Sequence, residues 1–231
     1  MMDGVAPTGV DLGASADAVR LAVLPGSRAD APTVAAEMFE RVSAIARLLQ
    51  AGRQRIQAFV SVAPGVDPHV VVTALRERGA QLPSVRGGPG VVSRVAADSL
   101  ELVIVWGCFG DVLAASQVAL GQAGTANEQA AGFGLPVVAA LEPGETPAKM
   151  QWYRMRQKRL LGEALLVLPS KPQLFAKEVV ALLDDPRRQA AMAEAGKQRM
   201  GKPGGAAAVA DALAAIGSQD ERTRGDGAAH E

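Results

Sequence analysis

Short apolar runs alternate with amphipathic stretches along most of this chain. The apolar runs predict strands over 21–24, 56–62, 102–106, 117–120, 136–138 and 165–168. Between them, apolar residues recur at helical spacing, and the clearest series is Val34, Met38, Val42, Ile45 and Leu49. Prolines near the beginnings of several helices and glycines near their ends support this division. Strands that alternate with helices predict an α/β fold, namely a mostly parallel, Rossmann-like sheet with helices on both faces.

The pattern also divides the chain into three parts. Residues 1–19 are rich in Gly, Ala and Asp, lack periodicity and are predicted to be a linker. Residues 20–217 are predicted to form one Rossmann-like domain, in which 80–99 is ambiguous: a glycine turn there has a short strand on either side. The polar residues 218–231 are predicted to be a disordered tail.

Composition narrows the function. Lys plus Arg and Asp plus Glu both number 24, so nucleic acid is not an expected partner. The only cysteine, Cys108, excludes an internal disulfide and a multi-cysteine zinc site, and the two histidines leave little room for histidine-based metal or triad chemistry. No apolar run reaches the roughly 18 residues of a membrane span, and the amino terminus lacks the features of a signal peptide. The protein is therefore expected to be cytoplasmic.

The segment Gly124–Ala130 is the most informative motif. It follows an apolar run, opens an alanine-rich helix and precedes a second apolar run at Leu135–Val138. A glycine turn before a helix frees backbone N–H groups and directs the positive end of the helix at an anion, usually a phosphate. The loop Gly26–Arg28 also follows a strand, and ligands of open α/β sheets bind at the carboxyl ends of strands. An ordinary tight turn remains the alternative interpretation.

Five motifs occur in an order that resembles the lipid-A-disaccharide synthase-related proteins, which are glycosyltransferases of the two-domain GT-B architecture. They are Val23–Arg28, Phe109–Ala114, Gly124–Gln129 with the following Gly134–Val138, Gln157–Gly162 and Met200–Gly205. The resemblance reaches from the first residues to about Ile216. It covers the carboxyl-terminal, donor-binding half, and Met1–Gly4 resembles the segment that joins the two domains. The amino-terminal, acceptor-binding domain is therefore expected to be missing or separately encoded.

This resemblance implies a UDP-sugar site. Gly124 and Thr125 would face the diphosphate, as would Gly26, Ser27 and Arg28 from the interdomain side. Glu128 would hold the ribose, although in the synthase itself the acidic residue falls one position later, at Gln129 of this chain. Gln157 would contact the sugar, and Trp106 lies in the loop that holds the base in such folds. No Asp-x-Asp motif is present, so we expect the helix dipole and Arg28 to stabilise the diphosphate, with no metal ion or cofactor. The general base is expected in the missing domain, so no catalytic residue is assigned.

Alternatives stay open at this point. The chain could be a non-catalytic or degenerate nucleotide-sugar-binding module, or it could be related to UDP-N-acetylglucosamine epimerases, which share this architecture. A dehydrogenase is disfavoured, because no Gly-x-Gly-x-x-Gly follows the first strand. Trp106 could be a core or rim residue. The basic residues of 149–159 could be a solvated helix face or could contact anionic lipid at the inner face of the membrane.

Overall fold

A seven-stranded sheet forms the centre of the protein. The structure, a computed structural model, describes residues 2–52, 54–141 and 150–226. The strands are β1 (Ala18–Leu24), β2 (Arg55–Val62), β3 (Gly90–Ala97), β4 (Leu100–Trp106), β5 (Val118–Gly121), β6 (Val137–Leu141) and β7 (Leu165–Pro169). They lie in the order β3-β4-β2-β1-β5-β6-β7, and only the edge strand β3 is antiparallel to its neighbour. The mostly parallel α/β sheet that the sequence predicted is thereby confirmed.

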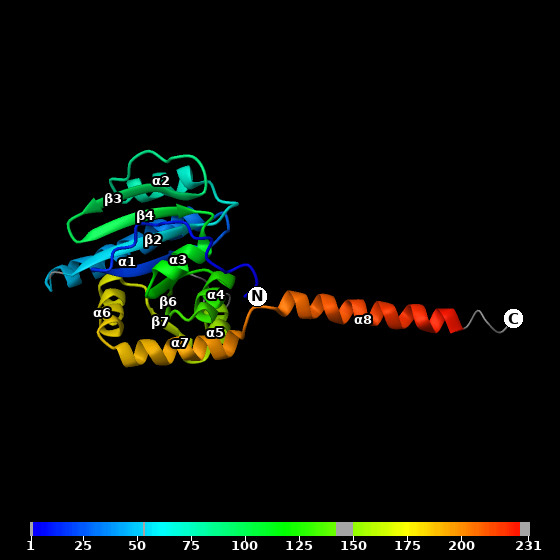
Figure 1. Cartoon of the computed structure of the whole chain (residues 1–231). Coiled ribbons are helices and arrows are strands. Elements are labelled where there is room, and N and C mark those ends of the chain that lie inside the picture. Colours follow the sequence, from blue (N-terminus) through cyan, green and yellow to red (C-terminus); the bar gives the residue numbers. More distant parts are fainter. Residues whose placement is uncertain (1, 53, 142–149, 227–231) are drawn as a thin grey trace.

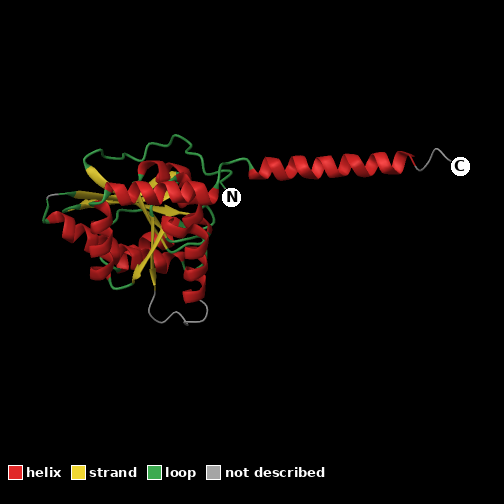
Figure 2. Ribbon diagram, turned by 90° about the horizontal axis from the view of Figure 1, so that it is seen from below, coloured by secondary structure: helices red, strands yellow, loops and turns green. Residues whose placement is uncertain are grey.

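Helices cover both faces of this sheet (Figures 1 and 2). They are α1 (Ala31–Gln50), α2 (Pro68–Glu77), α3 (Phe109–Ala115), α4 (Thr125–Phe133), α5 (Met150–Leu161), α6 (Pro172–Leu183), α7 (Pro186–Met200) and α8 (Gly205–Asp226), with a 3-10 turn, η1, at Gly162–Ala164. Apolar side chains of α1, α2 and α6 pack on one face, and those of α3, α4 and η1 pack on the other. The core therefore consists of two layers, one on each side of the sheet.

The strand β3 resolves the ambiguous region of the sequence. Only the stretch after the glycine turn pairs, and it runs antiparallel to β4 with a register shift between Val91 and Ser93. The second half of this strand shows little alternation between buried and exposed residues, and Arg94 is exposed. The strand therefore lacks the continuous apolar run of the central strands. An edge strand pairs on one side only, which explains why its hydrophobic pattern is weak.

The segment predicted as a linker lies against the domain. Met2, Val5 and Leu12 are buried in the same apolar layer as α3 and α4. Within this segment, which we call the amino-terminal strap (residues 2–15), the backbone N–H groups of residues 8, 9 and 10 all donate to the Asp111 carboxylate, at 2.8–3.1 Å. The Thr8 hydroxyl donates to the same carboxylate at 2.8 Å. The strap is thus held by one buried carboxylate as well as by apolar packing.

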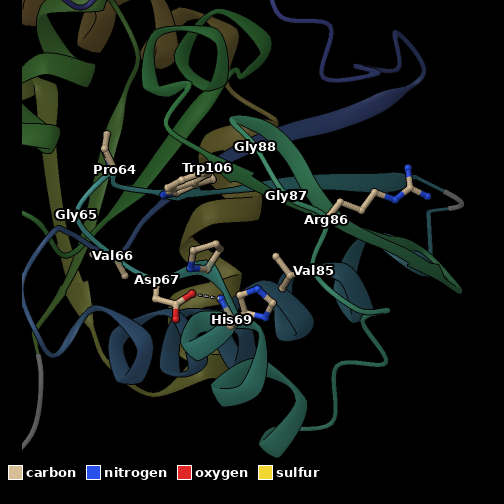
Figure 3. A pocket seen from close by; sticks show the side chains of 11 residues that line it. Pro64, Gly65, Val66, Asp67, His69, Val85, Arg86, Gly87, Gly88 and Trp106 are labelled. Carbon is tan, nitrogen blue, oxygen red and sulfur yellow. Dashed lines mark hydrogen bonds between the residues drawn. The ribbon is translucent and has the colours of Figure 1, made fainter.

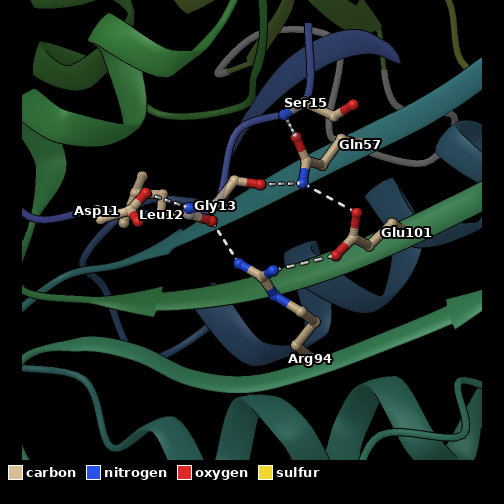
Figure 4. A network of polar contacts seen from close by, with 7 residues as sticks. All are labelled: Asp11, Leu12, Gly13, Ser15, Gln57, Arg94 and Glu101. Carbon is tan, nitrogen blue, oxygen red and sulfur yellow. Dashed lines mark hydrogen bonds and ion pairs between the residues drawn. The ribbon is translucent and has the colours of Figure 1, made fainter. Parts of the chain in front are cut away.

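A second polar cluster holds the end of the strap over the sheet (Figure 4). The buried Gln57 side chain on β2 accepts from the Ser15 N–H at 2.9 Å and donates to the Gly13 carbonyl at 2.8 Å. It also donates to Glu101 on β4 at 2.9 Å, and Glu101 in turn forms an ion pair with Arg94 at 3.3 Å. These contacts join the strap to three neighbouring strands.

The last helix stands apart from the rest of the fold. In Figure 1, α8 projects from the body of the molecule and begins close to the amino terminus. The Asp3 carboxylate accepts from the backbone N–H groups of Gly204 and Ala206, at 2.5 and 3.0 Å, at the beginning of α8. These two bonds hold the pKa of Asp3 below its usual value. The helix continues to Asp226, beyond the predicted domain end at 217, because residues 218–224 include the good helix formers Gln, Glu and Arg.

None of the helices in the described ranges is both long and apolar enough to cross a lipid bilayer.

Candidate functional site

The order of the strands creates a point where connections leave the sheet in opposite directions. The strand β1 lies between β2 and β5, and the chain leaves β1 toward β2 through α1 but leaves β5 toward β6 through α4. Since α1 and α4 lie on opposite faces, a crevice opens beyond the carboxyl ends of β1 and β5. Ligands of open α/β sheets bind at such a point.

A cleft of about 530 Å³ lies there. Its walls come from the ends of β1, β2, β4 and β5, from the first turns of α1, α3 and α4, and from α5. The residues that line it are Gly4, Leu24, Pro25, Gly26, Ser27, Arg28, Asp30, Val34, Glu37, Ser61, Val62, Ala63, Pro64, Gly107, Phe109, Gln122, Ala123, Gly124, Thr125, Ala126, Gln129 and Arg154. The cleft therefore brings together five of the eight residues that the sequence assigned to a ligand: Gly26, Ser27, Arg28, Gly124 and Thr125.

The Gly26–Arg28 loop contributes a cation. It connects β1 to α1, and Ser27 and Arg28 are exposed. The Arg28 carbonyl accepts from the Ala31 N–H at 3.0 Å, which fixes the backbone at the beginning of α1. Among the residues that the structure describes, no side chain forms a hydrogen bond or ion pair with the Arg28 guanidinium. This guanidinium can therefore bind an anion in the cleft without first losing another partner.

The beginning of α4 contributes backbone donors. Gly124 is the N-cap of α4, and no side chain caps the helix from this position. The carbonyl of Gly124 accepts from the N–H groups of Asn127 and Glu128, at 3.1 and 3.3 Å, which closes the first turn. Within the described part of the chain, the N–H groups of residues 123–126 have no acceptor. A helix of nine residues thus directs its positive end and its unsatisfied donors into the cleft.

The three other predicted ligand residues lie elsewhere. Glu128 does not line the cleft, whereas Gln129, one position later on α4, does. Gln157 on α5 is only 3% exposed, and its side-chain amide contacts the loop before α4 rather than the cleft. Trp106 at the end of β4 lines a neighbouring pocket.

That neighbouring pocket is more open and has a volume of about 470 Å³. It lies between the β2–α2 loop and the loop before β3, and Pro64 lines both it and the cleft. Figure 3 shows Trp106 and His69 at this pocket, with the Asp67 carboxylate accepting from the backbone N–H of His69 at 2.8 Å. Asp67 caps the beginning of α2 through this hydrogen bond, so its carboxylate has a structural role.

Arg154 and Gly4 are among the cleft residues that the sequence did not predict. Arg154 on α5 is 1% exposed and donates to the Gln122 carbonyl at 2.8 Å, although its position in a run of basic residues suggested a solvated surface. Lys158 of the same run donates to the carbonyls of Gly162 and Leu165, at 2.8 and 2.6 Å. Gly4 brings the amino-terminal strap to the cleft wall. No local signal in the sequence marks either Arg154 or Gly4 as a site residue.

The Cys108 thiol, which lies next to the cleft residues Gly107 and Phe109, is not activated. Burial, and then the negative charge of Asp111, raises the pKa of the Cys108 thiol, so this thiol is a poor nucleophile at neutral pH. Among the described residues, no three His, Cys, Asp or Glu side chains converge in a way that could hold a metal ion. The cleft therefore offers backbone N–H groups, two guanidinium groups and small polar side chains, together with the carboxylates of Asp30 and Glu37 on the α1 side.

The fold and the position of the cleft are those of an open, doubly wound α/β domain. Neither the comparison with protein-family models nor the comparison with curated proteins finds a match to this chain. Solved structures do match. A putative UDP-N-acetylglucosamine 2-epimerase from Listeria monocytogenes is 19% identical with a TM-score of 0.57, and the match covers 96% of this chain and 51% of that one.

A second match is the UDP-GlcNAc 2-epimerase from Neisseria meningitidis bound to UDP-GlcNAc, at 13% identity and a TM-score of 0.54, over 86% of this chain and 45% of that one. The spinosyn rhamnosyltransferase SpnG is 17% identical with a TM-score of 0.49, over 81% and 42%. The chain has the Rossmann-like fold of GT-B proteins, as the sequence predicted, and it spans about half the length of these structures.

Proposed function

We propose that this chain is the nucleotide-sugar-binding half of a two-domain protein and that its ligand is a UDP-sugar. The observation that carries the proposal is the cleft beyond β1 and β5, which is lined both by Arg28 and by the residues at the beginning of α4. A diphosphate is complementary to both groups, because its oxygens accept hydrogen bonds from backbone N–H groups and pair with a guanidinium. Asp30 and Glu37 line the α1 side, so the anion belongs nearer to α4.

The roles of the residues follow from this placement. The backbone of Gly124 and Thr125, with the Thr125 hydroxyl, would hold the diphosphate on one side, and Arg28 would hold it on the other. The guanidinium of Arg154, below the loop, adds positive charge, so that the diphosphate would be bound without a metal ion. The ribose would contact Gln129, which lines the cleft, rather than its neighbour Glu128. The base would lie toward the end of β4, where Trp106 stands at the rim.

The favoured reaction is transfer of a hexosyl group from UDP to a hydroxyl of a lipid or sugar acceptor, as in the lipid-A-disaccharide synthase-related proteins. The acceptor oxygen would bond to the anomeric carbon, and the bond from that carbon to the diphosphate oxygen would break. Negative charge then develops on the departing UDP, and Arg28 and the amide groups before α4 are arranged to stabilise it. The base that takes the acceptor proton is assigned to the second domain of such a protein.

A UDP-N-acetylglucosamine 2-epimerase-type activity is the second candidate. It is favoured by the similarity to two such epimerases with TM-scores of 0.57 and 0.54. It would use the same diphosphate site but needs acid and base groups for the sugar. The two candidates differ in what they require: an epimerase changes UDP-GlcNAc in the absence of an acceptor, whereas a transferase does not.

A thermal-shift titration tests the proposal. UDP at about 100 times its dissociation constant should stabilise the protein by roughly 2.7 kcal/mol, whereas NAD should not raise the melting temperature. Equal stabilisation by NAD would refute the donor-site assignment. For the reaction, UDP-GlcNAc is incubated with the chain, first alone and then with lipid or sugar acceptors, and followed by NMR. We expect binding without turnover, because positioning by two domains contributes roughly 7–11 kcal/mol to such reactions. Conversion of UDP-GlcNAc without an acceptor would select the epimerase.

A further inference from the structure

The loop before α4 is held from below along its whole length. Each carbonyl of the four residues Gly121–Gly124 accepts a hydrogen bond from one of three side chains, Asn127, Arg154 and Gln157. The pairs are Asn127 with Gly121 at 3.1 Å, Arg154 with Gln122 at 2.8 Å, and Gln157 with Ala123 at 3.4 Å and with Gly124 at 3.0 Å. Four successive carbonyls are thus directed toward one cluster of three side chains.

The three side chains also hold one another. Gln157 accepts from Asn127 at 3.1 Å and from Arg154 at 3.4 Å through the same amide oxygen. All three are buried, with exposed fractions of 3% for Gln157, 0% for Asn127 and 1% for Arg154. In a low-dielectric interior, connected hydrogen bonds strengthen one another and fix a single arrangement. Gln157 occupies the centre of this cluster, because it alone contacts both of the other side chains and two of the loop carbonyls.

The orientation of the carbonyls determines where the N–H groups point. In a planar trans peptide, the carbonyl of one residue and the N–H of the next point in opposite directions. With the carbonyls of residues 121–124 directed toward the side chains of Asn127, Arg154 and Gln157, the N–H groups of residues 122–125 point away from these side chains. The first of these N–H groups donates to the Leu24 carbonyl at 3.1 Å. The next three belong to Ala123, Gly124 and Thr125, which all line the cleft.

We propose that Gln157 is a positioning residue, which sets the backbone of this loop so that the N–H groups of residues 123–125 converge on a diphosphate. This inference rests on the proposed function, and it gives Gln157 a role through the loop in place of the contact with the sugar that the sequence suggested. A loop that holds its donors in place before the ligand arrives does not have to order them on binding. The selectivity of the cleft for phosphate over a neutral ligand therefore depends on a side chain that never touches the ligand.

Gly121 supplies a second way to disturb the same cluster. A methyl group at this position would overlap the amide oxygen of Asn127, which is fully buried. The Gly121→Ala substitution should therefore displace the Asn127 side chain and, through it, the oxygen of Gln157 to which Asn127 donates. The result should resemble that of changing Gln157 itself.

The test uses two variants. Gln157→Met keeps the side-chain volume but removes both the acceptor oxygen and the donor NH₂ group, whereas Gln157→Glu keeps the acceptor but removes the donor. Gln57→Met is the matched control, since Gln57 is equally buried and makes three hydrogen bonds to the strap and β4. Dissociation constants are measured by calorimetry for UDP, inorganic pyrophosphate and uridine. Both Gln157 variants should weaken UDP and pyrophosphate by about tenfold or more. Uridine should change by less than about threefold, and the control should bind all three like the wild type.

Each outcome decides the inference. Equal affinity of wild type and both Gln157 variants for UDP overturns it while the proposed function stands. An equal loss for uridine and UDP also overturns it, because a general distortion would not select the diphosphate. If the wild type binds neither UDP nor pyrophosphate, the proposed function fails. In that case hydrogen exchange of the amides of Asn127 and Glu128, which donate to Gly124, decides whether Gln157 orders the loop. The inference is overturned if the exchange rates of these amides are unchanged in a folded Gln157 variant. If neither Gln157 variant folds, the same measurement is made on Gly121→Ala, and unchanged rates there overturn the inference.

Discussion

The Asp111 carboxylate provides the most direct test of how the amino-terminal strap is held. Asp111 is 5% exposed and accepts four hydrogen bonds, three from backbone N–H groups and one from the Thr8 hydroxyl. The Asp111→Asn substitution replaces one carboxylate oxygen by an NH₂ group, which faces donors instead of accepting from them. Hydrogen bonds to a charged group contribute roughly 1.5–3 kcal/mol each, but the strap is partly solvated, so the total is below the sum. We expect Asp111→Asn to lower the free energy of unfolding by about 2–3 kcal/mol at pH 7.

The pH dependence of this loss carries more information than its size. Burial by itself would raise the pKa of Asp111, but the hydrogen bonds from Thr8, Gly9 and Val10 outweigh it and hold the pKa below the usual value of 3.8. A carboxylate with a depressed pKa contributes stability above its unfolded pKa and loses it as the pH falls through the folded one. The difference between wild type and variant should therefore be constant from neutral pH down to about pH 5, and it should shrink below pH 4.

Urea unfolding followed by circular dichroism, at several pH values, measures this difference. Asp17→Asn is the control, because it makes the same change of charge at an exposed carboxylate without a hydrogen bond among the described residues. The reasoning is refuted if Asp111→Asn unfolds within about 0.5 kcal/mol of the control at pH 7. It is also refuted if the difference persists undiminished at low pH, because the cost would then arise from packing and not from the charge.

Two further predictions concern the cleft. Arg28→Ala should weaken UDP by about 1.5–3 kcal/mol and leave uridine nearly unchanged, because the guanidinium acts on the diphosphate; calorimetry of both ligands checks this, and an equal loss for uridine would contradict it. Gln129→Ala should weaken UDP and uridine alike, because Gln129 lines the cleft, whereas Glu128→Ala should alter neither by more than about twofold. The opposite pattern, with a loss for Glu128→Ala and none for Gln129→Ala, would assign the ribose contact to Glu128.

Much of the fold could be predicted from the sequence because its signals are local. Six strands were predicted from apolar runs, and an apolar run such as 56–62 is typical of a strand that is buried on both sides of a sheet. The edge strand β3 was ambiguous, because its second half is mostly exposed and its sequence includes Ser and Arg. The strap had no periodicity at all. Its position depends on Asp111, about 100 residues away in the chain, and no local pattern announces such a contact.

The site divides in the same way. Glycine turns at the ends of β1 and β5 could be found because both the turn and the preceding strand are visible in the sequence. Arg154 could not, since its neighbours Arg156 and Arg159 are exposed and the three side chains differ only in which way the helix turns them. Gln157 was predicted to contact the sugar because its motif is recognisable in the sequence. In the structure, its amide donates to the loop carbonyls of Ala123 and Gly124. Sequence patterns therefore located the loops, whereas the residues behind them required tertiary contacts.

The packing of the strap has a practical consequence for handling this protein. Met2 is buried, Asp3 caps α8, and Gly4 lines the cleft, so the first residues lie beside the cleft. An affinity tag fused ahead of them would have to emerge beside the cleft and the base of α8. The far end of α8 projects away from the body (Figure 1), and a tag there would be remote from the site. Binding measurements are therefore best made with a carboxyl-terminal tag.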